Sequence, residues 1–227
     1  SSMLCAVMAR SAARYNRHQH AQLFHSRTKL KIGLVGGSFN PAHAGHIHMS
    51  LQACSKLGLD QVWWLVSPQN PLKSPTNMAR LPHRLAKARD ITAPYSFIHV
   101  VTPEASLPSN FTYETVKYIK KTMPLARLAW IMGADNLVQL RQWQRYKGFI
   151  SLLPIAVIDR PSYYYQAMCA GRQLFRRRYT TAQLRHRLRE SRVDLPGWCF
   201  IAGQRHHASA TAIRQGHAAS HASTDDI

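Results

Sequence analysis

Acidic residues are scarce in this chain of 227 residues: ten Asp and Glu stand against thirty Lys and Arg, and none precedes Asp60. The resulting formal charge of +20 attracts polyanions, a class that includes nucleic acids, acidic membrane surfaces and phosphorylated small molecules. Charge alone does not choose among these partners, so nucleic-acid binding stays an alternative function. The scarcity also leaves no acidic cluster that could enclose a hard cation such as Mg²⁺.

Long apolar runs and paired cysteines are missing as well. No segment approaches the roughly eighteen consecutive apolar residues that a membrane helix needs, and residues 152–158 are at most a buried strand. The four cysteines lie far apart without a C-x-x-C pair, which argues against a disulfide framework of the secreted kind. These absences predict a soluble, cytoplasmic protein that has no membrane partner.

The two ends of the chain differ in composition from its middle. Residues 1–28 are rich in Arg, Ser and Ala and lack acids, a composition shared by mitochondrial transit peptides and by disordered basic extensions. We favour the disordered extension, followed by one folded domain over residues 29–216. Residues 217–227 are small and polar, which predicts a disordered tail.

The apolar pattern of the middle alternates short strands with helices. Strands are predicted near residues 30–35, 62–66, 97–101, 127–132, 154–158 and 198–202, and helices from about His46 to Gly58, over 80–92, and over 112–123 with Thr112 as N-cap. This alternation predicts an α/β, Rossmann-like, doubly wound fold with a mainly parallel sheet and helices on both faces. Ligands of such sheets bind beyond the carboxyl ends of the strands, which selects the loops 36–46, 67–73 and 133–136.

A stretch rich in arginine, residues 176–192, lies outside this regular alternation. Its arginines include Arg176, Arg177 and Arg178, and then Arg185, Arg187, Arg189 and Arg192 on a predicted helix. We interpret it as a solvated basic helix in preference to a contact with nucleic acid or a membrane.

The strongest chemical signal is a glycine turn that leads to two histidines, Gly36-Gly37-Ser38-Phe39-Asn40-Pro41-Ala42-His43-Ala44-Gly45-His46. Glycines between a strand and a helix let backbone amides approach a phosphate, and the helix start adds N–H groups and the positive end of its dipole. His43 and His46 are three residues apart, so both imidazoles can donate hydrogen bonds to the same group of phosphate oxygens. The run therefore predicts phosphate chemistry without a covalent intermediate.

Two other interpretations of these histidines stay open. His43, His46 and His48 could bind a metal ion, although no Asp or Glu lies near them and the spacing is not H-E-x-x-H. The histidines could also simply cap the helix. We expect no metal bound by the protein itself.

The run resembles the signature of the H-x-G-H nucleotidyltransferase superfamily and, within it, of the bacterial nicotinate-nucleotide adenylyltransferases. Their motif is G-G-[ST]-F-[DN]-P-x-H-x-G-H, and a second motif near the C-terminus, S-[ST]-T-x-[IL]-R, is similar to residues 209–214. Ser209 and Thr211 offer hydroxyl groups and Arg214 a guanidinium fork for phosphate oxygens, although a capped helix with a surface arginine has the same composition.

The resemblance implies an enzyme that joins nicotinate mononucleotide to the α-phosphate of ATP and releases pyrophosphate, with Mg²⁺ carried on the ATP phosphates. His43, His46 and Arg214 would be catalytic. The implied ATP and phosphate ligands are Gly36, Gly37, Ser38, Phe39, Lys73, Gly133, Asp135, Ser209 and Thr211. The implied mononucleotide ligands are Asn40, Thr112 and Trp143.

Several of these assignments have a plainer alternative. Lys73 could be an exposed loop lysine, Asp135 could cap the next helix, and Trp143 could be a core residue. Asn110, Phe111 and Ala210 depart from the family pattern, which leaves nicotinamide mononucleotide or another phosphorylated acceptor as alternative substrates. Nucleic acid is a less favoured partner, and the sequence leaves a homo-oligomer open.

Overall fold

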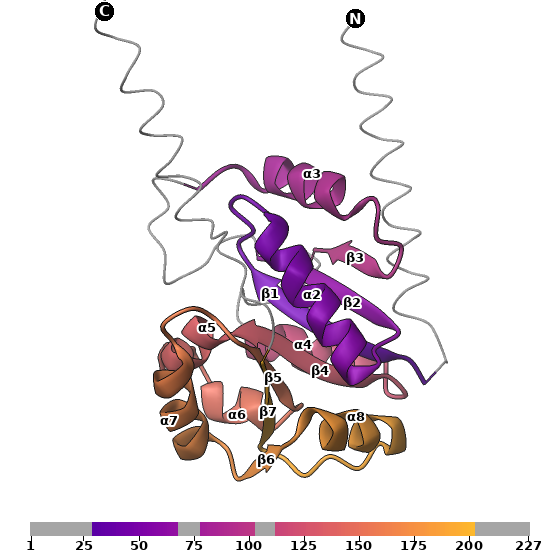
Figure 1. The fold of residues 1–227 in the computed structure, drawn as a ribbon. Helices are drawn as coiled ribbons and strands as arrows, with labels where there is room; N and C mark the ends of the chain where they lie inside the picture. The colour runs from indigo at the N-terminus through magenta and orange to yellow at the C-terminus, as the bar shows by residue number, and fades with distance from the viewer. Residues whose placement is uncertain (1–28, 68–77, 103–111, 203–227) are drawn as a thin grey trace, which may run out of the picture.

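A computed structural model describes residues 29–67, 78–102 and 112–202 of the chain (Figure 1). Its centre is a sheet of seven strands in the order β3-β2-β1-β4-β5-β7-β6, and every neighbouring pair is parallel. The strands are β1 (Lys31–Gly37), β2 (Gln61–Val66), β3 (Ile98–Val101), β4 (Arg127–Gly133), β5 (Ile155–Ile158), β6 (Arg177–Tyr179) and β7 (Gly197–Ile201). The predicted Rossmann-like parallel sheet is thus confirmed.

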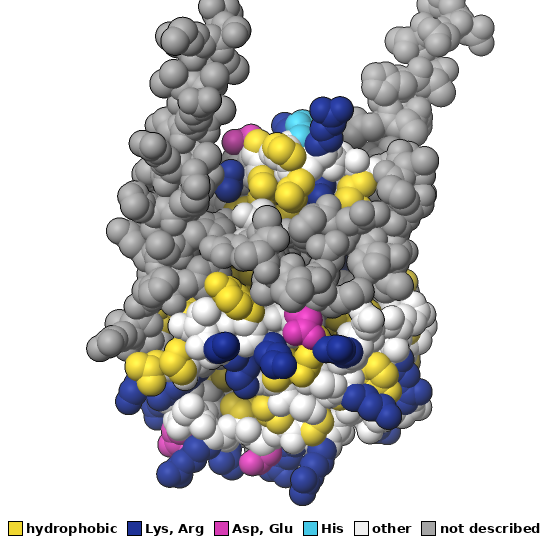
Figure 2. All heavy atoms as spheres, turned by 180° about the vertical axis from the view of Figure 1, so that it is seen from behind, with side chains coloured by type: hydrophobic (Ala, Val, Ile, Leu, Met, Phe, Trp, Pro, Cys, Tyr) yellow, Lys and Arg dark blue, Asp and Glu magenta, His cyan; other side chains and the backbone are white. Residues whose placement is uncertain are grey.

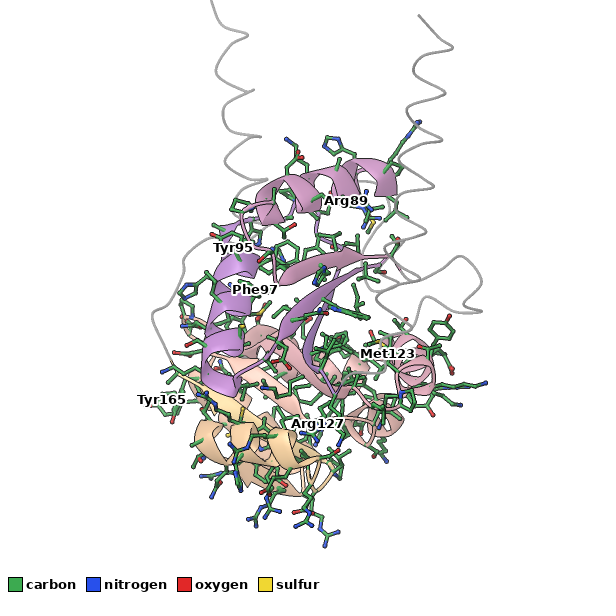
Figure 3. The ribbon with its side chains drawn as sticks, turned by 90° about the vertical axis from the view of Figure 1, so that its right-hand side faces the viewer. Arg89, Tyr95, Phe97, Met123, Arg127 and Tyr165 are labelled. Carbon is green, nitrogen blue, oxygen red and sulfur yellow. The ribbon has the colours of Figure 1, made fainter. Side chains whose placement is uncertain are left out.

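Helices cover both faces of this sheet. One layer consists of α2 (Ala44–Leu57), α3 (Leu81–Thr92) and α8 (Thr181–Glu190), whose buried apolar residues share one core cluster. The other consists of α4 (Thr112–Thr122), α5 (Ala134–Gln139), α6 (Tyr146–Ile150) and α7 (Tyr164–Leu174), with the short 3-10 helix η2 (Leu140–Gln142) between α5 and α6. In the edge-on view of Figure 3, α2 and the segment labelled at Met123 lie on opposite sides of the sheet.

Both faces are buried because successive strand residues point to opposite sides and nearly all of them are apolar. In β2, Trp63 and Leu65 belong to one core cluster while Val62, Trp64 and Val66 belong to the other. Such continuous apolar strands are typical of parallel sheets that are covered on both faces. None of the described helices combines the length and the apolar character needed to cross a membrane.

The strand order reverses between β1 and β4, which creates the switch point of the sheet. From β1 the chain builds outward through β2 to β3, and it then returns to place β4 on the other side of β1. The loops that leave β1 and β4 therefore diverge, and the opening between them is where α/β sheets bind ligands. Gly37 and Gly133 end these two strands.

Most predicted elements lie within a residue or two of their expected bounds. Helix α2 ends as expected, because Gly58 adopts the left-handed conformation (φ 63°, ψ 45°) and its N–H donates to the carbonyl of Cys54. Thr112, the expected N-cap, is instead the first residue of α4. The strand β6 was not predicted: its three residues include two exposed arginines and carry no alternating apolar pattern. The calls for residues 1–28 and 217–227 lie outside the described residues.

Candidate active site

The two histidines of the glycine turn form a capping box at the start of α2. His43 is the N-cap, and its Nδ1 accepts a hydrogen bond from the N–H of Gly45 at 3.1 Å. His46, three residues on, accepts the N–H of His43 with its own Nδ1 at 3.3 Å. The rings are in contact, with centroids 4.0 Å apart. Histidine thus fills both positions that Ser or Thr and Glu or Gln usually occupy in this motif.

This capping has a chemical consequence for both imidazoles. A neutral imidazole carries one proton, and a ring whose Nδ1 accepts a hydrogen bond carries that proton on Nε2. Both rings therefore present Nε2 as a hydrogen-bond donor while Nδ1 completes the helix start. The capping and phosphate-donor interpretations of the sequence are compatible, because they use different nitrogens of the same rings.

The two glycines before the histidines differ in what their missing side chains allow. A Cβ on Gly36 would lie 2.4 and 2.7 Å from ring carbons Cη2 and Cζ2 of Trp130, a buried residue of β4. Among the residues that the structure describes, a Cβ on Gly37 would meet only Phe39, at an ordinary 3.6 Å. Gly36 is therefore explained by packing inside the protein. No comparable contact among the described residues accounts for Gly37, and its predicted role in the close approach of a phosphate stays a prediction.

Phe39 shapes the loop between β1 and α2. Its φ of 46° lies in the left-handed region, which costs a residue other than glycine about 1–3 kcal/mol. Its side chain is only 2% exposed and stacks on Trp64, with centroids 4.8 Å apart. The ring is thus a core residue, and Phe39 can face a bound nucleotide only with its main chain.

A buried arginine, Arg84 of α3, connects this loop to the end of β2. Its Nη1 donates to the carbonyls of Ser38 (2.6 Å) and Ser67 (2.8 Å), and its Nε donates to the carbonyl of Ala79 (2.9 Å). The N–H of Ser67 in turn donates to the carbonyl of Gly37 at 2.9 Å. Burial lowers the pKa of Arg84. This guanidinium fixes the ends of β1 and β2 relative to each other and places positive charge beneath the glycine turn.

The other side of the switch point carries an ion pair. Asp135 lies in the first turn of α5, whose N-cap is Gly133, so Asp135 does not cap that helix. Its Oδ1 is 3.8 Å from Nε of Arg160, which follows β5. Both of these atoms are buried, and neither has a hydrogen-bond partner among the described residues. A Cβ on Gly133 would lie 2.3 Å from that carboxylate oxygen, so the glycine makes room for the pair.

The predicted mononucleotide ligands lie in three different places. Asn40 follows Phe39 in the loop, and its Oδ1 accepts the N–H of Ala79 at 3.2 Å. Thr112 is half-buried at the start of α4. Trp143 is half-buried after η2 and packs edge-on against Trp130 at the margin of a core cluster, with centroids 6.1 Å apart, and its predicted contact with the mononucleotide stays a prediction. Lys73, Ser209, Thr211 and Arg214 lie outside the described residues.

The arginines of residues 176–192 lie away from the histidines. Figure 2 shows Lys and Arg side chains gathered at the lower end of the molecule, where Figure 1 places β6 and α8. Nε of Arg185 lies 2.9 Å from the position that a Cβ on Gly58, the residue that ends α2, would take. Because α2 has 14 residues, its two ends are about 21 Å apart, and the histidines cap the other one. Among the described residues, no group of His, Cys, Asp and Glu is placed to hold a metal ion.

Proteins similar in sequence match most of the length of this chain. The cytidylyltransferase-like family matches residues 34–216. A protein of Cereibacter sphaeroides named "Probable nicotinate-nucleotide adenylyltransferase" is 42% identical over 190 residues, which are 82% of this chain and 97% of that protein. A protein of the same name from Methylorubrum extorquens is 41% identical over 191 residues, 82% of this chain and 99% of that protein. This chain belongs to the nicotinate-nucleotide adenylyltransferase family.

Solved structures agree with the fold of this family member. Two structures of Plasmodium falciparum nicotinic acid mononucleotide adenylyltransferase, one complexed with NaAD and one with APC, superpose with TM-scores of 0.61 and 0.58. They cover 82% of this chain and 83% of the other, at 17% and 16% identity. At such identities the likeness supports the shared fold alone.

Arg84 and Arg160 are the site residues of this family member that sequence reasoning missed. Arg84 occupies the buried face of α3 together with Ala88 and Thr92, four and eight residues later. The available signal was the spacing: a charged residue falls on the helix face that its buried neighbours occupy. Arg160 had no comparable signal, because its partner Asp135 is remote in sequence.

Proposed function

We propose that this protein transfers the adenylyl group of ATP to nicotinate mononucleotide, producing nicotinate adenine dinucleotide and pyrophosphate. The observation that carries the proposal is the His43–His46 capping box, whose two Nε2 donors lie at the switch point of the sheet beside the glycine turn. The family to which the chain belongs supports the choice of substrates.

The reaction is an in-line displacement at the α-phosphorus of ATP. An oxygen of the mononucleotide phosphate forms a new bond to that phosphorus, the bond to the bridging oxygen between the α- and β-phosphates breaks, and pyrophosphate leaves with its electron pair. Both reactants are anions, so holding them together and offsetting their charge is the main task of the site.

The residues of the glycine turn and of α2 supply donors for that charge. The Nε2–H groups of His43 and His46 would donate to phosphate oxygens whose charge grows in the transition state, and each such donor contributes about 3–4 kcal/mol. The start of α2 adds its dipole, and Gly37 leaves room for a phosphate next to the main chain. The two imidazoles and the start of α2 are held in place by the capping box, so these donors need little reorientation during the reaction.

The remaining predicted ligands complete the proposal. Asp135, held beside Arg160, is suited to the ribose hydroxyls of ATP, while Trp143 and Thr112 would line the mononucleotide pocket. Lys73, Ser209, Thr211 and Arg214 keep their predicted phosphate roles. Mg²⁺ would arrive on the ATP phosphates, because their oxygens are ligands that it prefers and the described part of the chain offers no cluster to hold it.

The test is pyrophosphate release with ATP and Mg²⁺, with nicotinate and nicotinamide mononucleotides offered in parallel. We expect turnover with the acid, and no turnover with either acceptor would refute the proposal. His46→Ala should lower kcat about 10²–10³-fold. The matched control is His186→Ala, which removes an exposed histidine of α8 that pairs with Glu190 and should leave kcat unchanged. Equal kcat in the two variants would remove His46 from the mechanism.

A further inference from the structure

The ring of His46 rests against two buried aromatic side chains. Its centroid lies 4.8 Å from that of Phe39 and 5.7 Å from that of Trp64. Phe39 and Trp64 are themselves stacked, 4.8 Å apart with an interplanar angle of 18°. Trp64 is fully buried, and Phe39 nearly so. Together they form a rigid surface on one side of the imidazole, because closely packed buried rings have little freedom to move.

A chain of hydrogen bonds links Trp64 to the main chain of the same histidine. The Trp64 indole Nε1–H donates to Oγ of Ser50 at 2.9 Å, and the Ser50 hydroxyl donates to the carbonyl of His46 at 2.8 Å. Ser50 is fully buried, one helical turn after His46. Because each hydroxyl hydrogen and each indole N–H makes one such bond, the chain has a single direction from Trp64 to His46.

We propose that Trp64 and Ser50 are positioning residues, which hold the His46 imidazole in the orientation in which it acts on phosphate. This inference rests on the proposed adenylyl transfer. The capping box fixes His46 through Nδ1, but a hydrogen bond to one ring atom leaves the tilt of the ring free. The aromatic surface restricts that tilt, and the Ser50 bond holds the segment of α2 that carries the ring. A donor displaced by about 1 Å can lose about 10²-fold in rate, so small changes in this support should reach kcat.

Trp63 offers a matched control in the same strand. Like its neighbour Trp64 it is fully buried, and its Nε1–H also donates a hydrogen bond, at 2.9 Å to Oε1 of Gln61. Its side chain, however, points to the opposite face of the sheet and packs in the other core cluster, with Leu34 and Trp130. Substituting either tryptophan removes the same chemical group from β2, but only one of them touches His46.

The experiment measures kcat and KM for ATP in variants of the full chain with saturating nicotinate mononucleotide. We expect Trp64→Leu to lower kcat about 10–100-fold with KM within about twofold, while Trp63→Leu stays within about threefold of wild type. Trp64→Phe keeps an aromatic ring at this position but loses the hydrogen bond and part of the packed volume, so it should recover most of the rate that Trp64→Leu loses. Equal kcat in the two leucine variants would overturn the proposal, as would a loss that appears only in KM.

Conservative variants keep the test decisive if Trp64→Leu does not fold. Ser50→Ala and Trp64→Phe interrupt the same hydrogen-bond chain, so each should lower kcat about three- to tenfold and the double variant no further than the lower single one. Wild-type kcat in both single variants would overturn the positioning role. Absence of turnover in the wild type would instead overturn the proposed function, so the two failures are distinguishable.

Discussion

The adjacent glycines Gly36 and Gly37 permit a sharp test, because the structure assigns them different reasons for lacking a side chain. A methyl group on Gly36 would lie 2.4 Å from Cη2 of Trp130, far inside van der Waals contact. The indole cannot move aside easily, since it packs edge-on against Phe149 with centroids 5.2 Å apart and is only 2% exposed. Overpacking of this kind costs about 1–3 kcal/mol.

For Gly36→Ala we therefore expect a melting temperature about 2–12 °C below wild type, measured by calorimetry or circular dichroism. Gly37→Ala should melt within about 2 °C of wild type, because its methyl group would meet Phe39 at an ordinary 3.6 Å and alanine reduces the entropy of the unfolded chain. Its cost should appear in activity instead, as a drop of about tenfold or more in kcat/KM for ATP, since the methyl group would occupy the space proposed for a phosphate.

A second substitution checks the cause of the Gly36 effect. Trp130→Phe removes the two ring carbons that the methyl group would meet, and it removes an indole N–H that has no hydrogen-bond partner among the described residues. In the Trp130→Phe background, Gly36→Ala should lose much less stability than in the wild type. Equal losses in both backgrounds, or a Gly37→Ala variant with full kcat/KM, would refute the reasoning.

Further predictions concern buried polar groups. Arg84→Met should lower the free energy of unfolding in urea by about 2–4 kcal/mol, because it leaves main-chain carbonyl groups without their donor. Arg84→Lys should recover only part of this loss. An unchanged free energy of unfolding in Arg84→Met would contradict this account. Burial raises the pKa of the Cys199 thiol to about 12, so alkylation followed by peptide mapping should label the exposed Cys169 quickly and Cys199 only after unfolding. Burial also lowers the pKa of His99 below its ordinary 6.5, and the unfolded chain therefore takes up this proton first. The free energy of unfolding should fall as the pH drops below about 6.5, and His99→Gln should reduce that slope; an unchanged slope would show that His99 is not responsible.

Local patterns in the sequence were sufficient for the fold class, and they also led to the prediction of the candidate site. Apolar runs of strand length alternate with segments whose apolar residues have helical spacing. Each of these patterns can be recognised within a short stretch of sequence. The glycine turn and its histidines are likewise contiguous, so strand, turn and helix start could be recognised together. Gly58 ended α2 for a similarly local reason, its left-handed backbone conformation.

Other features depended on contacts between residues far apart in the chain. Arg84 donates to the carbonyls of Ser38 and Ser67, which are 46 and 17 residues away in the chain. No pattern in the sequence around Arg84 indicates these acceptors. Asp135 meets Arg160 only because β4 and β5 are neighbours in the sheet. The edge strand β6 carries no apolar alternation of its own, because it is paired on one side only and its arginines face solvent.

Gly36 and Gly37 at the end of β1 show the same contrast between local sequence patterns and long-range contacts. The sequence by itself predicted that the backbone at residues 36 and 37 admits a phosphate, because that property depends on adjacent residues, and the structure makes these two residues the end of β1. Only the tertiary structure decided that Gly36 is required by Trp130 of β4, whereas a Cβ on Gly37 would make no close contact with the described residues. The physical reason is that backbone conformation depends on adjacent residues, while packing depends on which strands the fold brings together.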